Sequence, residues 1–232
     1  MGCDHLPTEP RILRACALGQ VPYEAALALQ ERLVRARQQN ACPDTLLLLE
    51  HPPVITEGRS SKGQHLRIPR AELAVRGIAH HKCGRGGDIT YHGPGQLVLY
   101  PIVSLAPDRQ DVRRYVWMLE EAMIRTASAF GLDAGRIQGL NGAWIDGARK
   151  VGAVGVRISR WVTMHGCALN VNLDLDAFAP IVPCGIADKG VTSLAAELGH
   201  PACMDAASRL LAEALAALLE AELQWVQTLN DT

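Results

Sequence analysis

Residues 142–158, GAWIDGARKVGAVGVRI, place an Asp-Gly pair between two apolar segments. A two-residue hairpin loop of type I′ has a positive φ at both of its positions, and Asp-Gly is one of the pairs that tolerates this best. Asp146-Gly147 therefore predicts a tight turn between two antiparallel strands. This hairpin favours a largely antiparallel or mixed sheet over a purely parallel one.

Other segments also have the composition of strands. Residues 45–59, TLLLLEHPPVITEGR, contain a short apolar run that two prolines stop, as in a buried strand followed by a loop. Residues 89–92 and 96–103 flank Gly-Pro-Gly, which predicts two strands with a tight turn between them. Residues 163–176 predict a further strand, because polar and apolar side chains alternate along it.

Two helices are predicted near the ends of the chain. Residues 22–40 begin with a proline and repeat apolar side chains at Ala25, Leu29 and Leu33. The segment after Pro201 is rich in alanine and leucine. It predicts a C-terminal helix that packs across the sheet.

A third helix, over residues 112–130, has the clearest boundaries. Asp111 is a favourable N-cap, and Gly131 is a natural stop. Apolar side chains recur along one stripe of this helix, which we expect to be core: Val112, Tyr115, Val116, Leu119, Met123, Ala127 and Phe130.

Helices and hairpins mixed along the chain predict the α+β class, with a mixed, largely antiparallel sheet and packed helices. The hydrophobic fraction of 48% is enough for a substantial core. No shift in composition marks a linker, and no segment is repeated. We therefore expect a single domain over residues 1–232.

Charge and cysteine content exclude several classes of protein. With 23 basic and 24 acidic residues the net charge is −1, so no global field attracts nucleic acid or a membrane surface. The seven cysteines are scattered and contain no CxxC or Cys/His ligand spacing, which argues against a disulfide framework and a metal site. The first residues have neither a secretion nor a lipidation pattern, and no apolar run reaches membrane-spanning length. We expect a soluble cytoplasmic protein.

The glycine-rich segment RGGDITYHGPGQ, residues 85–96, has two interpretations. Its glycines allow a ligand to approach the backbone closely, and Arg85, Tyr91 and His92 add polar groups. As a nucleotide-binding loop it lacks the GxxxxGK[ST] spacing. The alternative is a glycine-rich hairpin with a hydrogen-bonded core histidine.

Cys184 stands in PCG, residues 183–185, between two residues that interrupt regular structure. This position in a turn indicates an accessible thiol, although most single cysteines are inert and buried. Lys150 follows the hairpin turn at Asp146-Gly147. Taken alone, a lysine at such a place is a solvated surface charge.

The order of four motifs is more specific than any one of them. RGGDITYHGPGQ, KVGAVGVRI, HGCALNVN and PCGIADKGVTSL closely resemble the octanoyltransferases of lipoate biosynthesis, over about Leu46 to Leu198. The resemblance implies the α+β fold shared with biotin and lipoate protein ligases. It also implies transfer of an octanoyl group from octanoyl-acyl carrier protein to a lysine of lipoyl domains, as in 2-oxoacid dehydrogenase E2 subunits and the glycine cleavage H protein, with no cofactor.

The same resemblance implies roles for individual residues. It makes Cys184 the nucleophile that carries the acyl group as a thioester, and Lys150 the residue that favours the thiolate and moves protons. It assigns the following residues to the substrate pocket: Arg85, Gly86, Gly87, Asp88, Ile89, Thr90, Tyr91, His92, Ala153, Val154, Gly155, Gly166, Cys167 and Ala168.

Two positions depart from the family pattern. Gly84 stands where many members have an acidic residue before the arginine, which puts the local support of Arg85 in question. Cys167 stands where a larger apolar residue is common, which adds a thiol and alters the shape of the acyl pocket. Neither departure falls on Cys184 or Lys150.

The chemistry agrees with these roles, because a thiolate exchanges readily with a thioester and the acyl-enzyme remains reactive toward an amine. Backbone amides near Gly185 or Gly166 are candidates to stabilise the oxyanion. His92 and His165 could orient the lysine or the acyl carbonyl, or could be structural. The positions of Cys83 and Cys167 relative to Cys184, the oligomeric state and the preferred acceptor stay open.

Two other functions remain open from the sequence. An ATP-dependent lipoate or biotin protein ligase on the same fold would bind ATP with magnesium and would form an acyl-adenylate without needing Cys184. A non-enzymatic protein that only binds acylated carrier protein would show binding without turnover.

Overall fold

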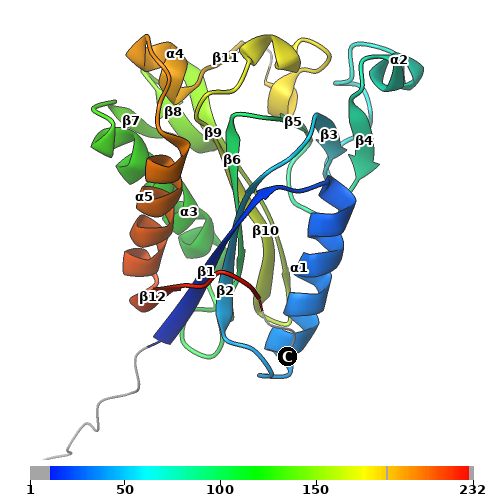
Figure 1. Cartoon of the computed structure of the whole chain (residues 1–232). Helices are drawn as coiled ribbons and strands as arrows, with labels where there is room; N and C mark the ends of the chain where they lie inside the picture. The colour runs from blue at the N-terminus through cyan, green and yellow to red at the C-terminus, as the bar shows by residue number, and fades with distance from the viewer. Residues whose placement is uncertain (1–10, 187, 230–232) are drawn as a thin grey trace, which may run out of the picture.

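The computed structural model describes residues 11–186 and 188–229, and its centre is a nine-stranded sheet in the order β12-β1-β2-β6-β10-β9-β8-β7, with β11 beside β9 (Figure 1). A second sheet has three strands in the order β4-β3-β5. The strands of the large sheet are β1 (Arg11–Gln20), β2 (Asp44–Glu50), β6 (Gln96–Ile102), β7 (Ala134–Ile137), β8 (Leu140–Ile145), β9 (Arg149–Ser159), β10 (Val162–Asn170), β11 (Gly190–Val191) and β12 (Ala221–Trp225). Those of the small sheet are β3 (Val54–Glu57), β4 (Ala79–Lys82) and β5 (Ile89–His92).

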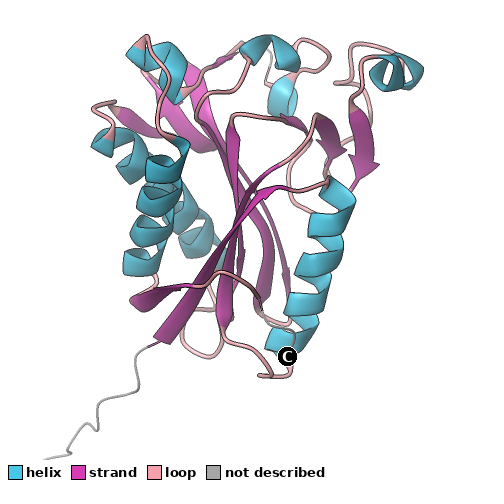
Figure 2. Cartoon of the chain, viewed as in Figure 1, coloured by secondary structure: helices cyan, strands magenta, loops and turns pink. Residues whose placement is uncertain are grey.

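The pairing within the large sheet is mixed and largely antiparallel, which confirms the expected fold class. Strand β1 pairs in parallel with both β2 and β12, and the short β11 pairs in parallel with β9. The remaining neighbours, from β2 across to β7, are antiparallel. Among the described residues there are also five α-helices and two short 3-10 segments: α1 (Tyr23–Gln38), α2 (Arg70–Val75), α3 (Val112–Ala129), α4 (Leu194–Leu198), α5 (Met204–Leu218), η1 (Leu175–Phe178) and η2 (Pro183–Gly185) (Figure 2).

The predicted hairpin at Asp146-Gly147 is confirmed as the turn between β8 and β9. Both residues have a positive φ, 51° and 62°, and the amide of Ala148 donates to the carbonyl of Ile145. This turn lets β9 begin shortly after β8 and pairs Lys150, near the start of β9, with Trp144 of β8.

The strands at residues 89–92 and 96–103 both form, but they belong to different sheets. Strand β5 pairs with β3, whereas β6 pairs with β2 and β10. The short turn between them therefore carries the chain from the small sheet into the large one. The segment after Pro53 was expected to be a loop and instead contains β3, the middle strand of the small sheet.

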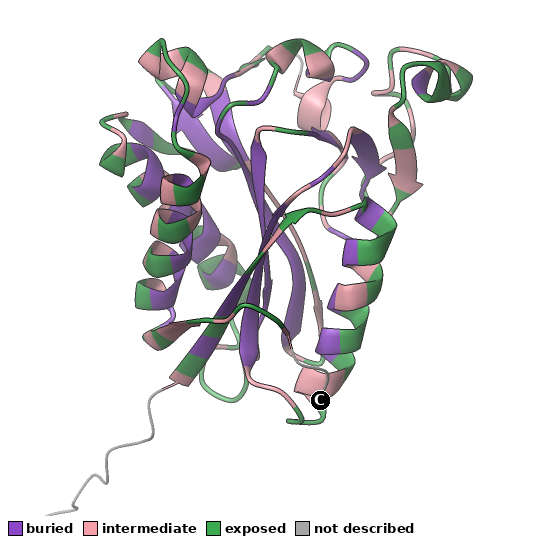
Figure 3. Cartoon of the chain, in the orientation of Figure 1, coloured by how far each residue is buried: buried purple, intermediate pink, exposed green. Residues whose placement is uncertain are grey.

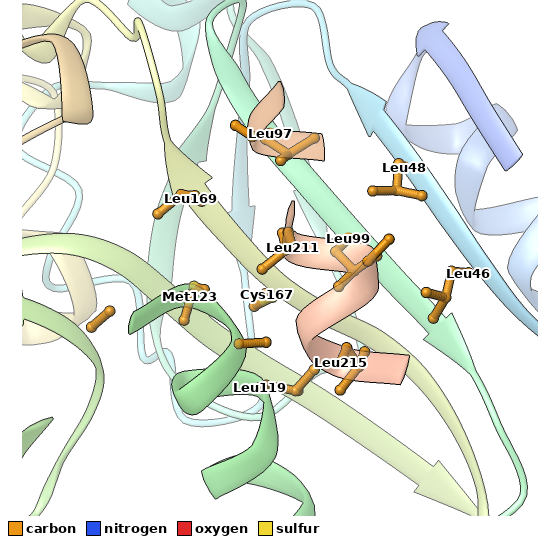
Figure 4. Packing of buried hydrophobic residues seen from close by; sticks show 14 of the residues in the cluster. Leu46, Leu48, Leu97, Leu99, Leu119, Met123, Cys167, Leu169, Leu211 and Leu215 are labelled. Carbon is orange, nitrogen blue, oxygen red and sulfur yellow. The ribbon is translucent and has the colours of Figure 1, made fainter. Parts of the chain in front are cut away.

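The large sheet lies between two helical layers, with α1 on one face and α3 and α5 on the other (Figure 1). Strand alternation divides the side chains of β2 between the layers, because Leu46 and Leu48 belong to the cluster with α3 and α5, whereas Leu47 and Leu49 pack with α1. The buried strands run through the middle of the molecule in Figure 3. Figure 4 shows the larger cluster, where leucines of β2 and β6 face α5, and where Met123 of α3 belongs to the same cluster as Leu169.

The predicted helices form, with two corrections to their buried faces. The side chain of Asp111 accepts from the amides of Arg113 and Arg114, as expected of an N-cap. Val112 is 45% exposed because it lies in the first turn of α3, beyond the edge of the core. In α1 the buried face contains Ala26 rather than Ala25, which is exposed.

The C-terminal helix is shorter than expected. Helix α5 ends at Leu218, and the chain then forms β12, which pairs with β1 at the edge of the large sheet. Residues 1–10, for which the sequence predicts neither a secretion nor a lipidation signal, lie outside the described residues. Within the described residues, no helix is both long and apolar enough to cross a bilayer.

Candidate active site

A cavity of about 300 Å³ opens where β5 of the small sheet meets β9 and β10 of the large sheet. Its walls come from the glycine-rich segment before β5, the middle of β9 and β10, and the turn at Cys184. The residues that line it are Tyr23, Arg85, Gly86, Gly87, Asp88, Ile89, Thr90, His92, Val98, Tyr100, Val116, Gly139, Leu140, Asn141, Lys150, Ala153, Val154, Gly155, Val156, His165, Gly166, Cys167, Ala168, Cys184 and Ile186. A volume near the lower end of the range for ligand pockets suits one small ligand or one short chain.

All of the residues that the sequence assigns to a substrate pocket line this cavity, except Tyr91. Neighbouring side chains of a strand point to opposite faces, so Thr90 and His92 face the cavity while Tyr91 faces away. The ring of Tyr91 packs instead against Phe178, with ring centroids 5.7 Å apart. Tyr91 therefore belongs to the small core behind β5.

The turn that carries Cys184 has an unusual backbone. Cys184 has φ 56° and ψ 14°, and the next residue, Gly185, has φ 70°. A left-handed conformation is uncommon for a residue with a side chain and costs roughly 1–2 kcal/mol. Such strain persists only where the surroundings hold it, and it gathers at functional sites. The amide of Gly185 donates to the carbonyl of Val182 within the turn, so this predicted oxyanion donor is already paired.

Lys150 reaches the sulfur of Cys184. Its Nζ donates a hydrogen bond to Cys184 Sγ over 3.2 Å. The side chain of Lys150 is only 6% exposed, and its Nζ lies 4.7 Å from the centroid of the Trp144 ring, which attracts a cation through its π-face. Lys150 is therefore not the solvated surface charge that its position after a hairpin turn suggests.

The loop that carries Cys184 is tied to the fold on both sides. Before the cysteine, the amide of Val182 donates to the carbonyl of His65 over 2.8 Å. After it, the amides of Gly190 and Thr192 donate to the carbonyls of Ala148 and Lys150 over 3.0 and 2.9 Å. These two hydrogen bonds flank the parallel pairing of β11 with β9, so the loop that carries Cys184 leads back to the strand that carries Lys150.

The His65 and Asp88 side chains form a hydrogen-bonded pair next to this loop. A Cβ added to Gly185 would come within 2.8 Å of the His65 ring and 3.0 Å of the Asp88 carboxylate, so glycine is needed there for contact as well as for φ. The sequence assigned Asp88 to the substrate pocket but gave no signal for His65, which lies in a loop.

Arg85 is held without a carboxylate partner among the contacts of the described residues. Its guanidinium donates to the carbonyl and hydroxyl of Thr56 and to the carbonyl of Gly86. A Cβ on Gly155 would lie 3.1 Å from Arg85 Cδ, so this glycine admits the arginine. At Gly84, where the family often has an acid, an added Cβ would lie 3.2 Å from the guanidinium of Arg157.

The histidines of the cavity are neutral at physiological pH. Burial, followed by the neighbouring His51 ring, lowers the pKa of His92 to about 3. Burial, followed by the charge of Arg85, lowers the pKa of His165 to about 4. The second thiol of the cavity, Cys167, is almost fully buried, and burial raises its pKa to about 12. Its thiolate population is therefore very small, and Cys167 is a poor nucleophile.

Several cavity residues were not predicted from the sequence. Four of them, Tyr23, Tyr100, Val116 and Val156, come from segments that were interpreted only as helix or strand. Leu140 lies between Gly131 and Gly142, a segment for which the sequence predicts no element. Of these residues, Tyr100 could have been recognised, because a polar ring in an otherwise apolar strand indicates a position next to a polar site. Within the part of the chain that the structure describes, no three His, Cys, Asp or Glu side chains gather as metal ligands would.

The family model and the similar proteins of known sequence agree on one family for this chain. Residues 22–216 match the model of the lipoyl protein ligase A/B catalytic domain. An octanoyltransferase of Chloroflexus aggregans is 50% identical over 205 residues, which cover 87% of this chain and 93% of that protein. An octanoyltransferase of Mycobacterium leprae is 46% identical over 232 residues, which cover 97% of this chain and 96% of that protein.

Comparison with solved structures supports the fold. A lipoate-protein ligase A bound with ATP superposes with a TM-score of 0.75 at 17% identity, over 94% of this chain and 90% of that one. A biotin protein ligase from Aquifex aeolicus superposes with a TM-score of 0.50 at 13% identity, over 89% and 68% of the two chains. At these identities the likeness concerns the fold alone.

Proposed function

The chain belongs to the lipoyl protein ligase A/B catalytic family and, within it, to the octanoyltransferases, and from this premise we propose that it passes an octanoyl group through a thioester on Cys184. The donor is octanoyl-acyl carrier protein, and the acceptor is a lysine of lipoyl domains. The observation that carries the proposal is the 3.2 Å contact between Lys150 Nζ and Cys184 Sγ at the wall of a cavity.

In the first half-reaction, Cys184 Sγ attacks the thioester carbon of the donor. A new carbon–sulfur bond forms, the bond to the carrier's sulfur breaks, and the ammonium of Lys150 gives its proton to the leaving thiolate. The hydrogen bond from Lys150 favours the thiolate of Cys184 before the attack, because a nearby cation stabilises the charged form. Lys150 is left neutral.

In the second half-reaction, the amine of the acceptor lysine attacks the same carbon. A carbon–nitrogen bond forms, the bond to Cys184 breaks, and neutral Lys150 takes the proton that the amine must lose. Both half-reactions together return the pair to its starting state. One lysine therefore serves as acid and then as base.

The apolar part of the cavity fits the role of an acyl slot. Its hydrophobic walls are formed by Val98, Leu140, Val154, Val156 and Ala168. Cys184 and Lys150 line the same cavity. Each buried methylene contributes about 0.8 kcal/mol, so a chain of eight carbons gains most of its binding free energy from such walls.

The family membership argues against the two other interpretations of the sequence. A thioester donor is already activated, so the transferase needs neither ATP nor magnesium, and we propose that the chain works without a cofactor. The acceptors that we expect are lipoyl domains of 2-oxoacid dehydrogenase E2 subunits and of the glycine cleavage H protein. We place the reaction in the cytoplasm, where the nucleophilic thiol stays reduced, and we assign it to one domain over residues 1–232.

The test is mass spectrometry of the intact protein and its peptides after mixing with octanoyl-acyl carrier protein in the absence of acceptor. An octanoyl adduct on the Cys184 peptide is expected, and addition of a lipoyl domain should remove it and modify the domain's lysine. No adduct, together with octanoyl transfer that requires ATP, would establish the ligase chemistry instead.

A further inference from the structure

Four polar groups form a buried chain that starts in the cavity and ends on a backbone carbonyl. His92 Nδ1 is 2.6 Å from Gln96 Oε1, and Gln96 Nε2 donates to Asn170 Oδ1 over 2.9 Å. Asn170 Nδ2 donates in turn to the carbonyl of Thr192 over 2.8 Å. His92, Gln96 and Asn170 are each more than nine-tenths buried.

The backbone carbonyl at the end fixes the direction of every hydrogen bond in this chain. A carbonyl can only accept, so Asn170 turns its amino group to Thr192 and its oxygen to Gln96. Gln96 then gives its amino group to Asn170, and the same nitrogen also contacts the carbonyl of Tyr91 at 3.3 Å. The oxygen of Gln96 is left for His92. Because this oxygen can only accept, the hydrogen of the pair sits on His92 Nδ1.

His92 is therefore the neutral tautomer with a bare Nε2. A second proton on the ring is disfavoured, because burial, His51 and the charge of Arg85 all lower the pKa of His92. The neighbouring His51 cannot supply a hydrogen either. Its Nδ1 donates to the carbonyl of Val21, and its Nε2 accepts from the hydroxyl of Tyr100 over 2.8 Å.

The ring of His92, which carries the unprotonated Nε2, lines the same cavity as the thiol of Cys184. His92 lines that cavity together with Cys184 and Lys150, and it lies on the same face of β5 as Thr90. Its partners Gln96 and Asn170 border a small recess that Lys150 and Cys184 also line. The network thus lies directly behind the reacting pair.

We propose that His92 Nε2 accepts a hydrogen bond from the amine of the acceptor lysine and so directs the nitrogen's lone pair at the acyl-enzyme. A bare nitrogen cannot donate to the thioester oxygen, and the octanoyl chain has no N–H group. Of the groups that exchange bonds at the acyl carbon, the thioester, the Cys184 sulfur and the acceptor amine, the amine is the one that carries N–H groups. The amine has two hydrogens. One is lost to Lys150 in the reaction, and the other, which is hydrogen-bonded to His92, stays on the nitrogen and becomes the N–H of the product amide.

In this arrangement His92 touches the substrate, and Gln96 and Asn170 are positioning residues that act through it. The proposal rests on the acyl-transfer function given above. The two are separable, because the function fails if Cys184 takes no octanoyl group, whereas the proposal fails if the acylated protein shows no particular role of His92 in the transfer to the amine.

The first test is independent of activity. In protein labelled with ¹⁵N-histidine, the resonances of His92, identified by their loss in His92→Gln, should show a protonated Nδ1 and an unprotonated Nε2 at neutral pH. In Gln96→Met, which keeps the length of the side chain but removes the acceptor, the ring should populate the other tautomer. A protonated Nε2 in the unaltered protein would overturn the proposal.

The second test separates the half-reactions by single-turnover kinetics. His92→Leu should slow transfer from octanoyl-Cys184 to a lipoyl domain by roughly ten- to a hundredfold, the usual effect of losing a hydrogen bond to a polar or charged group, and should slow acylation far less. His92→Gln offers a carboxamide acceptor and should recover part of the loss. The matched control is His200→Leu, an exposed histidine outside the cavity.

Equal slowing of both half-reactions by His92→Leu, with no recovery in His92→Gln, would mean that His92 only supports the fold. Unchanged transfer in a folded His92→Leu variant would equally remove the proposal. Thermal unfolding of each variant establishes that the kinetic comparison concerns folded protein.

Discussion

Lys150 donates a hydrogen bond to Cys184 across 3.2 Å, although 34 positions separate the two residues in the chain. Lys150 is fixed in β9, and the cysteine loop returns to the same strand through β11. The contact is therefore a product of the tertiary fold and not of proximity along the chain.

Cys184→Ala should abolish formation of the octanoyl-enzyme, because it removes the sulfur next to Lys150. Cys167→Ala should leave acylation largely intact, since burial raises the pKa of the Cys167 thiol to about 12 and keeps it protonated. Cys83→Ala should also leave it intact. The measurement is the octanoyl adduct by intact mass, and full adduct formation by Cys184→Ala would contradict the covalent mechanism.

Substitutions of Lys150 should separate its two roles. Lys150→Arg keeps a positive charge beside the thiol but cannot act as a base, so acylation should persist in part while transfer to the amine is much slower. Lys150→Met supplies neither the charge nor the base and should slow both half-reactions. Single-turnover rates of acylation and of transfer to the lipoyl domain, measured separately, test this. A normal acylation rate in Lys150→Met would show that the contact has no chemical role in acylation.

The cavity should select the length of the acyl chain. Hexanoyl has two methylenes fewer than octanoyl and should lose about 1.6 kcal/mol, or roughly fifteenfold in kcat/KM. Chains much longer than octanoyl should lose through overpacking against the cavity wall. Cys167→Leu should strengthen this limit, because it extends a larger side chain into the cavity. Equal kcat/KM for hexanoyl, octanoyl and dodecanoyl donors would refute a closed slot.

Stability should fall with pH as the buried histidines become protonated. The pKa values of His92 and His165 in the folded protein are about 3 and about 4, against about 6.5 for an unfolded histidine. Between these values and pH 6.5 the unfolded chain binds more protons, so the free energy of unfolding decreases as pH falls, by up to about 1.4 kcal/mol per pH unit for each histidine. His165→Gln should reduce this slope by one proton, as measured by urea unfolding over the range. The same slope in the variant would contradict the assignment.

Asp44 should be one of the most sensitive polar positions of the fold. Its carboxylate is 3% exposed and accepts from Arg11 Nε at 2.5 Å, Arg37 Nε at 2.7 Å and the amide of Ser104 at 2.9 Å. Asp44→Ala leaves these donors without their acceptor, and loss of one member of a buried ion pair costs about 3–5 kcal/mol. Urea unfolding should show the loss. Glu222→Ala, at an exposed position in β12, is the control and should change little.

The sequence predicts the strands better than their partners. The turn at Asp146-Gly147 is a local signal, because two residues suffice to define it, and the hairpin forms as expected. The turn between β5 and β6 is equally local, yet these strands join different sheets, since pairing is decided by distant segments such as β3 and β10. Strand β12 was missed for the same reason. Its pairing with β1 joins the two ends of the described chain, which composition does not reveal.

The residues of the candidate site also divide into those that local motifs predict and those that only the folded structure reveals. The motifs identify nearly all of the residues that line the cavity on β5, β9 and β10, because each motif is one continuous strand or turn. The missing residues, such as Tyr23 and Val116, reach the cavity from helices whose other side chains are core. The hydrogen bond of the Gly185 amide and the chain of hydrogen bonds behind His92 could not be predicted from the sequence, because their partners come together only in the folded structure.

The loop that carries Cys184 is anchored on both sides, by Val182 to His65 and by Thr192 to Lys150. If Cys184 carries the acyl group as we propose, a sulfur held in this way cannot swing between two stations, as a long flexible prosthetic arm does. Both protein substrates would then travel to one stationary point and use the same entrance in alternation. An excess of acceptor should therefore occupy the entrance of the unacylated enzyme and slow its reloading, so that turnover declines at high acceptor concentration and recovers when more donor is added.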